Sequence, residues 1–558
     1  MHDELLPGPS SVRLRPYPLL ILLVGLGVLA CLMLTLFFMR ASELPRTSET
    51  MRMADVARQL ADGKGFSTKI ATPLEIGLVK KVNPKPDLFD PPLFPVFTAV
   101  LFEPLLDGDI PGRMASVLAF ILMLAVVGYW GAKAFDLRTG AVAVVITCLT
   151  PGLLLNAVSG RPEPLAALFL AAAALPLIQM VRGREAPPVA REPIKAIWPG
   201  LFISLAGLTV YPALVLVIPI AVLVRVVYTE SRKRALFWFG MAWLVPQAIW
   251  LLRLSIVTGR PLLNPWLFMG GMFTRSRPGL AMTHIYTESA GAVLKDSASR
   301  GGELFLKFWS GFITAISYYP VIFGVVLFGL LLLGLWLKAE RPQARALRLS
   351  IILMGVLLPV MIGIFVPDTS YLALLGPLGL LYAVVVLLFL MDLLNSTAVK
   401  EGQYVFVPAR KQPGELFAHH VFAILGFCIY SLVTCLPFLS HPMKATGLPP
   451  ALVEWVRALP PDAILLSDKP EELGWATNRL SIGLPPSGAQ LAALVDATQG
   501  ITAVILSPDA ANLDPRSIMG VWQGVYTGLT APADLVPIKD IDRYIILAPG
   551  EGTQQVIE

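Results

Sequence analysis

Long apolar segments alternate with short polar ones along most of the chain. The first apolar run extends from about Leu19 to Met39, and about ten more lie between residues 114 and 440. A helix needs roughly 20 consecutive apolar residues to cross a bilayer, so the pattern predicts a membrane protein with about 11 transmembrane helices. The expected spans are 19–39, 114–134, 138–157, 163–182, 196–210, 212–228, 236–257, 318–337, 350–367, 371–394 and 418–440.

Basic residues in the polar segments indicate how these spans are oriented. Arg13 and Arg15 precede the first run, and every second connection after it is short and basic, as cytoplasmic loops are. We therefore expect an uncleaved anchor with a cytoplasmic N-terminus, and a C-terminus on the opposite face. The outer face then receives the 40–113 loop, the turn Ser159 to Pro164, the 258–317 loop and the tail.

The composition agrees with this membrane assignment. Of 558 residues, 55% are hydrophobic and only 15% are charged, whereas about 25% charged residues are usual in soluble domains. The net charge of +6 comes from the basic loops and does not indicate a nucleic-acid partner. The four cysteines fall inside apolar segments, which is typical of small core residues and not of disulfides or metal ligands.

The tail differs from the rest of the chain. Residues 441–450 have the composition of a linker, and residues 451–558 follow a pattern in which strands alternate with helices. Such alternation predicts a soluble α/β domain with a largely parallel sheet. The expected helices are 452–459, 471–476, 489–497 and 517–527, and the expected strands are 463–467, 479–484, 501–506 and 544–547.

The 40–113 loop opens with an amphipathic segment. Met53, Val56 and Leu60 recur at helical spacing, and charged residues take the other side, which predicts a helix lying on the membrane with Ser48 as its N-cap. Gly63 and Gly65 are expected to end it. Glu49 then lies just above the membrane, in the first turn.

The remaining candidate chemistry is sparse. The five histidines show no metal-ligand spacing, and acidic residues are nearly absent from the spans. Proton-coupled transporters usually carry carboxylates at mid-membrane. Carboxylates confined to one face favour a reaction at the membrane surface.

Several motifs, taken in order, resemble the GT-C superfamily of membrane glycosyltransferases, in its bacterial protein O-mannosyltransferase and aminoarabinose-transferase branch. The similarity covers about residues 19–440, and residues 1–440 are assigned to a GT-C-like domain. It rests on the acid and the spacing of the first-loop helix, on PPLFP (Pro91 to Pro95), on Arg113, on SGRPEPLAALF (Ser159 to Phe169) and on SYLALLGPLGLLYA (Ser370 to Ala383). The sequence departs from the family pattern where Glu49 replaces aspartate, Met53 replaces tyrosine and Ser370 replaces arginine.

The resemblance implies transfer of a sugar, with inversion, from a polyprenyl-phosphate donor to a lipid, glycan or protein acceptor at the periplasmic face of a bacterial inner membrane. Glu49 would be the catalytic base, with Glu43 as a rival acid. Arg161 and Glu163 would bind substrate, and Glu49 and Glu163 would hold a divalent cation if one is used. Further cationic candidates for the leaving phosphate are Lys80, Lys81, Lys85, Arg275, Arg277, Lys295 and Arg300.

Structural explanations exist for the same residues. Glu49 can simply complement a helix dipole, Arg161 can extend toward the interface, and Glu163 can begin the next span. Two other functions stay open. A lipid-linked-sugar transporter would need a polar path through the spans, and a non-catalytic scaffold would only present the C-terminal domain to a partner.

Overall fold

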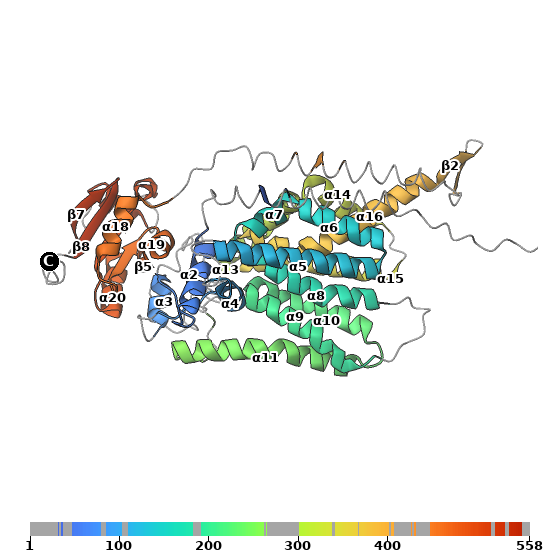
Figure 1. The fold of residues 1–558 in the computed structure, drawn as a ribbon, viewed down its shortest axis with the longest axis horizontal. Helices are drawn as coiled ribbons and strands as arrows, with labels where there is room; N and C mark the ends of the chain where they lie inside the picture. Colours follow the sequence, from blue (N-terminus) through green and yellow to red (C-terminus); the bar gives the residue numbers. More distant parts are fainter. Residues whose placement is uncertain are drawn as a thin grey trace, which may run out of the picture.

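A computed structural model describes residues 47–79, 85–102, 110–181, 191–261, 301–337, 341–365, 368–400, 403–406, 447–514, 519–529 and 535–549, with a few isolated positions elsewhere. Its helices form a bundle, and a strand-rich C-terminal unit lies at one end of that bundle (Figure 1). The 40–113 loop contributes short elements between the two (Figure 1). The expected spans 19–39 and 418–440 lie almost entirely outside the described residues.

The bundle is built from apolar helices that share one large hydrophobic core. Among the described residues, five segments are long and apolar enough to cross a membrane, or up to seven if each of two bent pairs is one span. The five are α5 (Ile110–Ala134), α8 (Glu163–Met180), α11 (Arg232–Thr258), α15 (Pro342–Ile364) and η5 (Thr369–Leu375) continued by α16 (Gly376–Ser396). Shorter apolar helices are α9 (Ile197–Thr209), preceded by η1 (Pro193–Ala196), and α10 (Val217–Val227), preceded by η2 (Tyr211–Leu216).

Two expected spans are bent pairs of helices. The segment expected at 138–157 consists of α6 (Leu137–Leu149) and α7 (Pro151–Val158), which meet at 65°. The segment expected at 318–337 belongs to α13 (Gly301–Phe323) and α14 (Val325–Trp336), which meet at 113°. Gly324, with φ +78°, forms this second corner, because a left-handed backbone costs glycine little. The predicted boundary between a loop reaching residue 317 and a span over 318–337 was therefore wrong, since α13 already begins at residue 301.

The first loop folds into three short helices and one short strand. These elements are α2 (Ser48–Ala61), β1 (Ile70–Ala71), α3 (Pro73–Leu78) and α4 (Leu93–Ala99). The side chain of Thr47, and not Ser48, caps α2, accepting a 3.3 Å hydrogen bond from the Thr50 amide. Gly63 and Gly65 follow α2 with positive φ, as the sequence predicts.

Apolar contacts attach this loop to the bundle. Leu74, Leu78 and Phe89 share a buried cluster with Trp250 and Leu254 of α11. A second cluster joins α2 and α4 to α5 and α8 through Met53, Phe94, Ala115, Ala119 and Leu165. The position of α2 is therefore fixed by packing against the spans.

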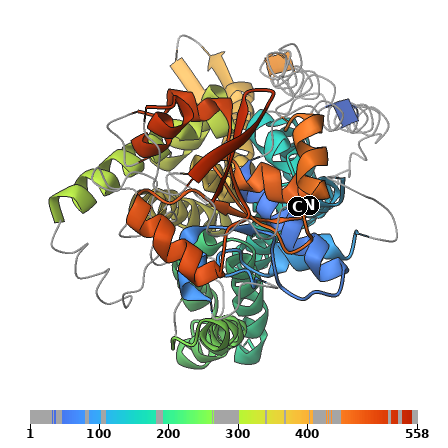
Figure 2. The same ribbon diagram turned by 90° about the vertical axis from the view of Figure 1, so that its left-hand side faces the viewer.

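A six-stranded mixed sheet forms the centre of the C-terminal unit, which Figure 2 shows in front of the bundle. The strand order is β1-β5-β4-β6-β8-β7, with parallel pairing from β1 to β6 and antiparallel pairing at β8 and β7. Its strands are β4 (Ile464–Ser467), β5 (Leu480–Gly483), β6 (Ala503–Leu506), β7 (Leu535–Ile541) and β8 (Tyr544–Pro549). Its helices are α18 (Pro450–Ala458), α19 (Pro470–Thr477), α20 (Gly488–Thr498), η6 (Pro508–Asn512) and α21 (Gly520–Tyr526).

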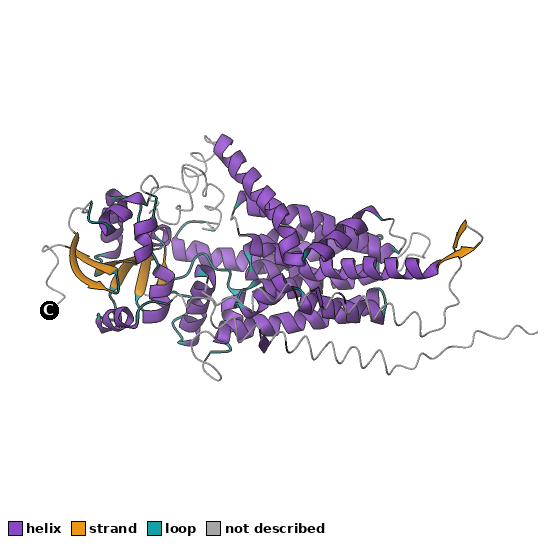
Figure 3. Cartoon of the chain, turned by 90° about the horizontal axis from the view of Figure 1, so that it is seen from above, coloured by secondary structure: helices purple, strands orange, loops and turns teal. Residues whose placement is uncertain are grey.

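One edge of this sheet comes from the first loop. Ile70 pairs with Ser481 and Ala71 with Ile482, and the Ser481 amide donates a 2.8 Å hydrogen bond to the Lys69 carbonyl. Ala71 and Ile76 also belong to the hydrophobic core of the C-terminal unit. The loop is thus part of both the bundle and the sheet. A small hairpin, β2 (Thr397–Lys400) and β3 (Gln403–Phe406), follows α16 at the opposite end of the molecule (Figure 3).

This arrangement changes the expected environment of α2. The sequence predicts a helix on the membrane with its charged side in water, but Arg52 and Asp55 are buried. The guanidinium of Arg58 lies 4.4 Å from the Trp475 ring and donates to the Trp475 carbonyl at 3.1 Å. The charged side of α2 therefore faces protein, because β1 brings the C-terminal unit against it.

Candidate active site

Three segments that are far apart in the sequence meet at the end of the bundle that faces the C-terminal unit. They are the first turn of α2, the turn before α8 and the start of η5. The Tyr371 hydroxyl donates a 3.1 Å hydrogen bond to Oε1 of Glu49. Glu49 is partly buried, and Tyr371 is only 7% exposed. A carboxylate at the N-terminus of a helix is thus held in place by a residue from a much later segment.

Beside this pair, one guanidinium joins two more carboxylates. Nη1 of Arg161 lies 3.3 Å from Oε1 of Glu163 and 3.5 Å from Oδ2 of Asp368. The Ser370 hydroxyl donates to the same Glu163 oxygen at 2.5 Å. The carbonyl of Arg161 accepts a hydrogen bond from Ser116 of α5. Glu163 is 1% exposed, and its Oε2 has no hydrogen-bond partner among the described residues.

These charges alter the protonation of Glu49. Burial, together with the negative charges of Glu163 and Asp368, raises the pKa of Glu49 to about 8, while Arg161 partly opposes this shift. The same carboxylates raise the pKa of Arg161, so that it stays cationic. A carboxyl group that titrates near neutral pH can accept or release a proton under physiological conditions, which suits general acid–base chemistry.

A second ionic network lies within the first loop. Arg52 contacts Asp90 at 3.0 Å, Asp87 at 3.2 Å and Glu75 at 3.6 Å. Lys85, whose side chain is fully buried, lies 3.0 Å from Oε1 of Glu75. Two cations thus face three carboxylates. Burial and the neighbouring Asp90 raise the pKa of Asp87 to about 7. Burial alone would raise the pKa of Glu75, but Lys85 and Arg52 outweigh it and lower that pKa.

The two networks are electrostatically connected. The charge of Asp90 makes the smallest contribution to the raised pKa of Glu49, after burial, Glu163, Asp368 and Arg161. Asp90 directly precedes Pro91 and α4, and Asp87 accepts a 2.9 Å hydrogen bond from the Asp90 amide. The ion pair between Asp90 and Arg52 therefore attaches the start of the PPLFP segment to α2.

The described residues do not fit a metal centre. No group of three or more His, Cys, Asp or Glu side chains in this part of the chain is arranged to hold a metal ion. Glu163 and Asp368 share Arg161 as their counter-charge, and Oε1 of Glu49 accepts from Tyr371. Each of these three carboxylates therefore already has a protein partner.

Comparison with solved structures identifies the architecture. ArnT from Cupriavidus metallidurans, bound to undecaprenyl phosphate, aligns with a TM-score of 0.53 at 14% identity, over 95% of this chain and 98% of that chain. The oligosaccharyltransferase AglB from Archaeoglobus fulgidus, in complex with an inhibitory peptide and a dolichol-phosphate, aligns with a TM-score of 0.55 at 13% identity, over 91% and 71%. Both are GT-C superfamily members.

The chain has the GT-C fold. No protein-family model matches the sequence, and no curated protein matches it significantly. The GT-C fold was expected from the motif order, and the structural neighbours confirm it. At these identities the likeness establishes the fold alone.

Within this GT-C fold, three of the candidate residues meet. Glu49 and the ion pair Arg161–Glu163 belong to one electrostatic group. Lys85 instead pairs with Glu75 in the neighbouring network. Arg275 and Arg277 lie outside the described residues, as does the rival acid Glu43.

Sequence reasoning did not identify Asp368 or Tyr371 as site residues, although Tyr371 lies in the Ser370 to Ala383 motif. Asp368 lies in the polar turn between the expected spans 350–367 and 371–394, and the predicted orientation places that turn on the same face as Glu49 and Arg161. Counting the turn with the other outer segments would have made Asp368 a candidate. Ser370, which stands where the family pattern has arginine, donates its hydroxyl to Glu163.

Proposed function

We propose that the protein is an inverting glycosyltransferase that moves a sugar from a polyprenyl-phosphate donor to an acceptor hydroxyl or similar nucleophile. The reaction would occur at the periplasmic face of a bacterial inner membrane. The observation that carries this proposal is the group of Glu49, Tyr371, Arg161, Glu163 and Asp368 at one end of an apolar bundle. The bound ligands of the structural neighbours, undecaprenyl phosphate and dolichol-phosphate, support the donor class.

In this proposal Glu49 is the general base. The acceptor oxygen attacks the anomeric carbon, its proton passes to Glu49, and the bond between the sugar and the phosphate oxygen breaks with its electrons going to the phosphate. A pKa of about 8 means that roughly one molecule in ten has an ionised Glu49 at pH 7, so the active fraction rises with pH. The hydrogen bond from Tyr371 orients the carboxylate toward one position.

Arg161 is the candidate for stabilising the departing phosphate. Negative charge grows on that group as the bond breaks, and a preorganised guanidinium lowers the energy of this change. Its ion pairs with Glu163 and Asp368 restrict its rotation. Glu163 and Asp368 would therefore act as positioning residues for Arg161.

The test is sugar transfer in membranes supplied with a panel of polyprenyl-phosphate sugars. Glu49→Gln keeps the shape of the side chain but cannot take a proton, so we expect transfer to fall about 10²-fold or more. Glu472→Gln is the matched control, because Glu472 also lies in the first turn of a helix, in the C-terminal unit, and should leave transfer unchanged. Equal transfer by wild type and Glu49→Gln would contradict the assignment of the base. No transfer by the wild type with any donor would favour a transporter or a scaffold.

A further inference from the structure

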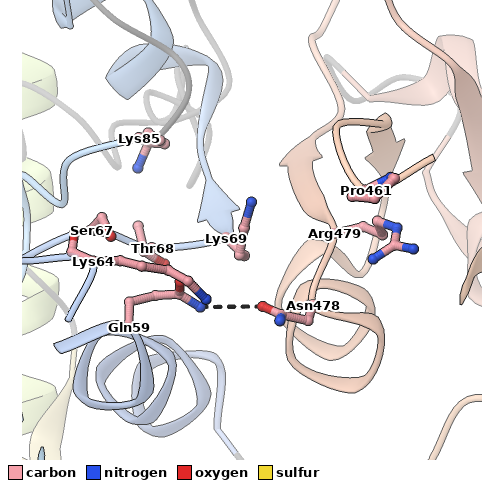
Figure 4. Close-up of a pocket in the computed structure, with 9 residues that line it drawn as sticks. All are labelled: Gln59, Lys64, Ser67, Thr68, Lys69, Lys85, Pro461, Asn478 and Arg479. Carbon is pink, nitrogen blue, oxygen red and sulfur yellow. Dashed lines mark hydrogen bonds between the residues drawn. The ribbon is translucent and has the colours of Figure 1, made fainter. Parts of the chain in front are cut away.

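A cavity of about 280 Å³, lined mainly by residues with polar or charged side chains, lies at the seam between the first loop and the C-terminal unit (Figure 4). None of its lining residues belongs to the Glu49 group. They come from the end of α2 and the segment after it, and from the neighbourhood of α18, α19 and β5 on the other side. The lining residues are Gln59, Lys64, Ser67, Thr68, Lys69, Lys85, Pro461, Asn478 and Arg479.

Positive charge dominates this cavity. Four of its nine lining residues are cationic and none is acidic. Two of the four have carboxylate partners, since Lys64 pairs with Asp62 at 2.6 Å and Lys85 pairs with Glu75 at 3.0 Å. These two cations are therefore already neutralised.

The other two cations lack an acidic partner in the described part of the chain. Nη2 of Arg479 donates to the Arg457 and Leu459 carbonyls, which are neutral, and its Nε has no acceptor among the described residues. Lys69 contributes its amide and carbonyl to hydrogen bonds, but no ion pair of its ammonium group is found there. Two positive charges thus lie uncompensated at the seam.

Asp55, the acid whose charge acts on Lys69, already has other partners. Asp55 accepts from Arg58 at 2.5 Å, from the Thr68 hydroxyl at 2.9 Å and from the Lys69 amide at 2.6 Å. Burial lowers the pKa of Lys69, and Lys64, Arg479 and Arg58 lower it further, although Asp55 acts in the opposite direction. The surroundings of Lys69 therefore carry a surplus of positive charge.

The rest of the lining suits a small polar ligand. Ser67 and Thr68 contribute hydroxyl groups, and Nε2 of Gln59 donates a 3.2 Å hydrogen bond to Oδ1 of Asn478 across the seam (Figure 4). Pro461 is the single apolar residue of the lining. The volume of about 280 Å³ is slightly below the roughly 300–1,000 Å³ of ordinary ligand pockets, so the cavity suits a small ligand.

We propose that this cavity binds a phosphate group, with Lys69 and Arg479 as its counter-charges. Phosphate offers several acceptor oxygens and up to two negative charges, which matches two lining cations without an acidic partner among the described residues, in a lining that also contains hydroxyl and amide side chains. The binding site is separate from the donor site of the proposed transfer reaction. Because both sides of the seam contribute, a bound phosphate would also strengthen the contact between the C-terminal unit and α2.

The experiment measures binding of inorganic phosphate to the purified full-length protein in a neutral detergent, by calorimetry at constant ionic strength and without sugar donor. Lys69→Gln removes the charge and should weaken binding about tenfold or more, the typical loss for a charged hydrogen bond. Lys69→Arg keeps the charge and should bind like wild type. Lys195→Gln is the control. Lys195 is an exposed lysine that forms an ion pair with Glu192, and it lies in η1, away from the cavity lining.

A second arm distinguishes a soluble phosphate from a lipid headgroup. Wild type and Lys69→Gln are placed in phosphatidylcholine nanodiscs with or without phosphatidic acid, and retained lipid is measured by native mass spectrometry. If the wild type retains phosphatidic acid and Lys69→Gln does not, the phosphate comes from a lipid headgroup. If the wild type binds inorganic phosphate but retains no phosphatidic acid, the phosphate comes from a soluble molecule. Either result supports the site.

Three results would overturn the proposal. They are absence of binding by the wild type with both probes, equal binding by wild type and Lys69→Gln, and loss of binding in Arg161→Gln without loss in Lys69→Gln. The last result would assign the phosphate to the Glu49 group. Glu49 does not line the cavity, so Glu49→Gln should bind phosphate like wild type. The binding assay measures no sugar transfer, so failure of this site and failure of the proposed reaction can be told apart.

Discussion

The Tyr371 hydroxyl donates a hydrogen bond to Oε1 of Glu49 across a sequence separation of 322 residues. Glu49 begins α2 in the first loop, and Tyr371 lies in η5, which leads into α16. The hydrogen bond therefore joins the first loop directly to one of the most deeply buried spans of the bundle. Any displacement of α2 relative to the bundle would break it.

Removing this hydrogen bond should change the pH at which the enzyme becomes active. A donor stabilises the ionised carboxylate, so Tyr371→Phe should raise the pKa of Glu49. We expect the midpoint of the pH–rate profile to move upward by about 0.5–1 unit, the equivalent of one ordinary hydrogen bond. Tyr382→Phe is the control, because Tyr382 donates to the Gly334 carbonyl within the bundle. An unchanged midpoint in Tyr371→Phe would mean that the bond does not act on the catalytic proton.

The raised pKa of Glu49 also predicts a pH-dependent stability. The carboxyl group ordinarily titrates near 4.5, and in the folded protein it titrates at about 8. Between these values the folded state holds a proton that the unfolded state has lost, so this group stabilises the fold at low pH and loses that effect as pH rises to about 8. Glu49→Gln cannot ionise. Its melting temperature relative to wild type should rise by at least about 2 °C between pH 5 and pH 9. A constant difference across this range would contradict the raised pKa.

Arg52 should be essential for the stability of the first loop. It is the only described cation in direct contact with all three of Glu75, Asp87 and Asp90, and removing one member of a buried ionic group leaves uncompensated charge. We expect Arg52→Gln to cost about 3 kcal/mol or more, visible as a melting temperature lowered by roughly 5 °C or more in detergent. Lys195→Gln, at an exposed pair, should change it by less than about 1 °C.

A double variant separates the charge effect from loss of packing. Asp90→Asn removes one of the carboxylates that Arg52 neutralises, so Arg52→Gln/Asp90→Asn should recover part of the stability lost in Arg52→Gln. If the double variant is as unstable as the sum of both single changes, the network does not act through charge balance.

The fold was predictable where the pattern is local. Apolar runs identified the five described segments that are each long enough to cross a membrane, and the alternation in the tail placed elements such as α18, β4 and β8 within a few residues of their observed bounds. The bend at Gly324 was not predictable, because an apolar run has the same composition whether it is straight or broken. The strand β1 was not predictable either. It has only two residues, which show no periodicity, and its partner β5 lies far along the chain.

The candidate site was predictable only in part, for a related reason. Glu49, Arg161 and Glu163 lie in short motifs whose spacing is visible in the sequence. Their interaction with Asp368 and Tyr371 depends on how the spans pack, which no local pattern encodes. Lys85 has the expected charge and the expected loop, but burial beside Glu75 gives it a structural partner.

The seam between β1 and the C-terminal unit offers a direct test of whether that unit positions the candidate base. A Cβ added at Gly474 of α19 would lie 2.8 Å from the Ile70 side chain and 2.9 Å from the Lys69 carbonyl oxygen, which is too close for either atom. The alanine itself suits a helix, so Gly474→Ala should leave α19 intact and push β1 away. Because β1 is continuous with the loop that carries α2, we expect sugar transfer to fall about tenfold or more, as small displacements of a catalytic group do. Gly488→Ala is the matched control, since nothing lies within 4 Å of a Cβ at that helical glycine, and it should transfer like wild type. If Gly474→Ala retains full transfer while protease cleavage shows a loosened seam, the C-terminal unit does not hold Glu49 in place.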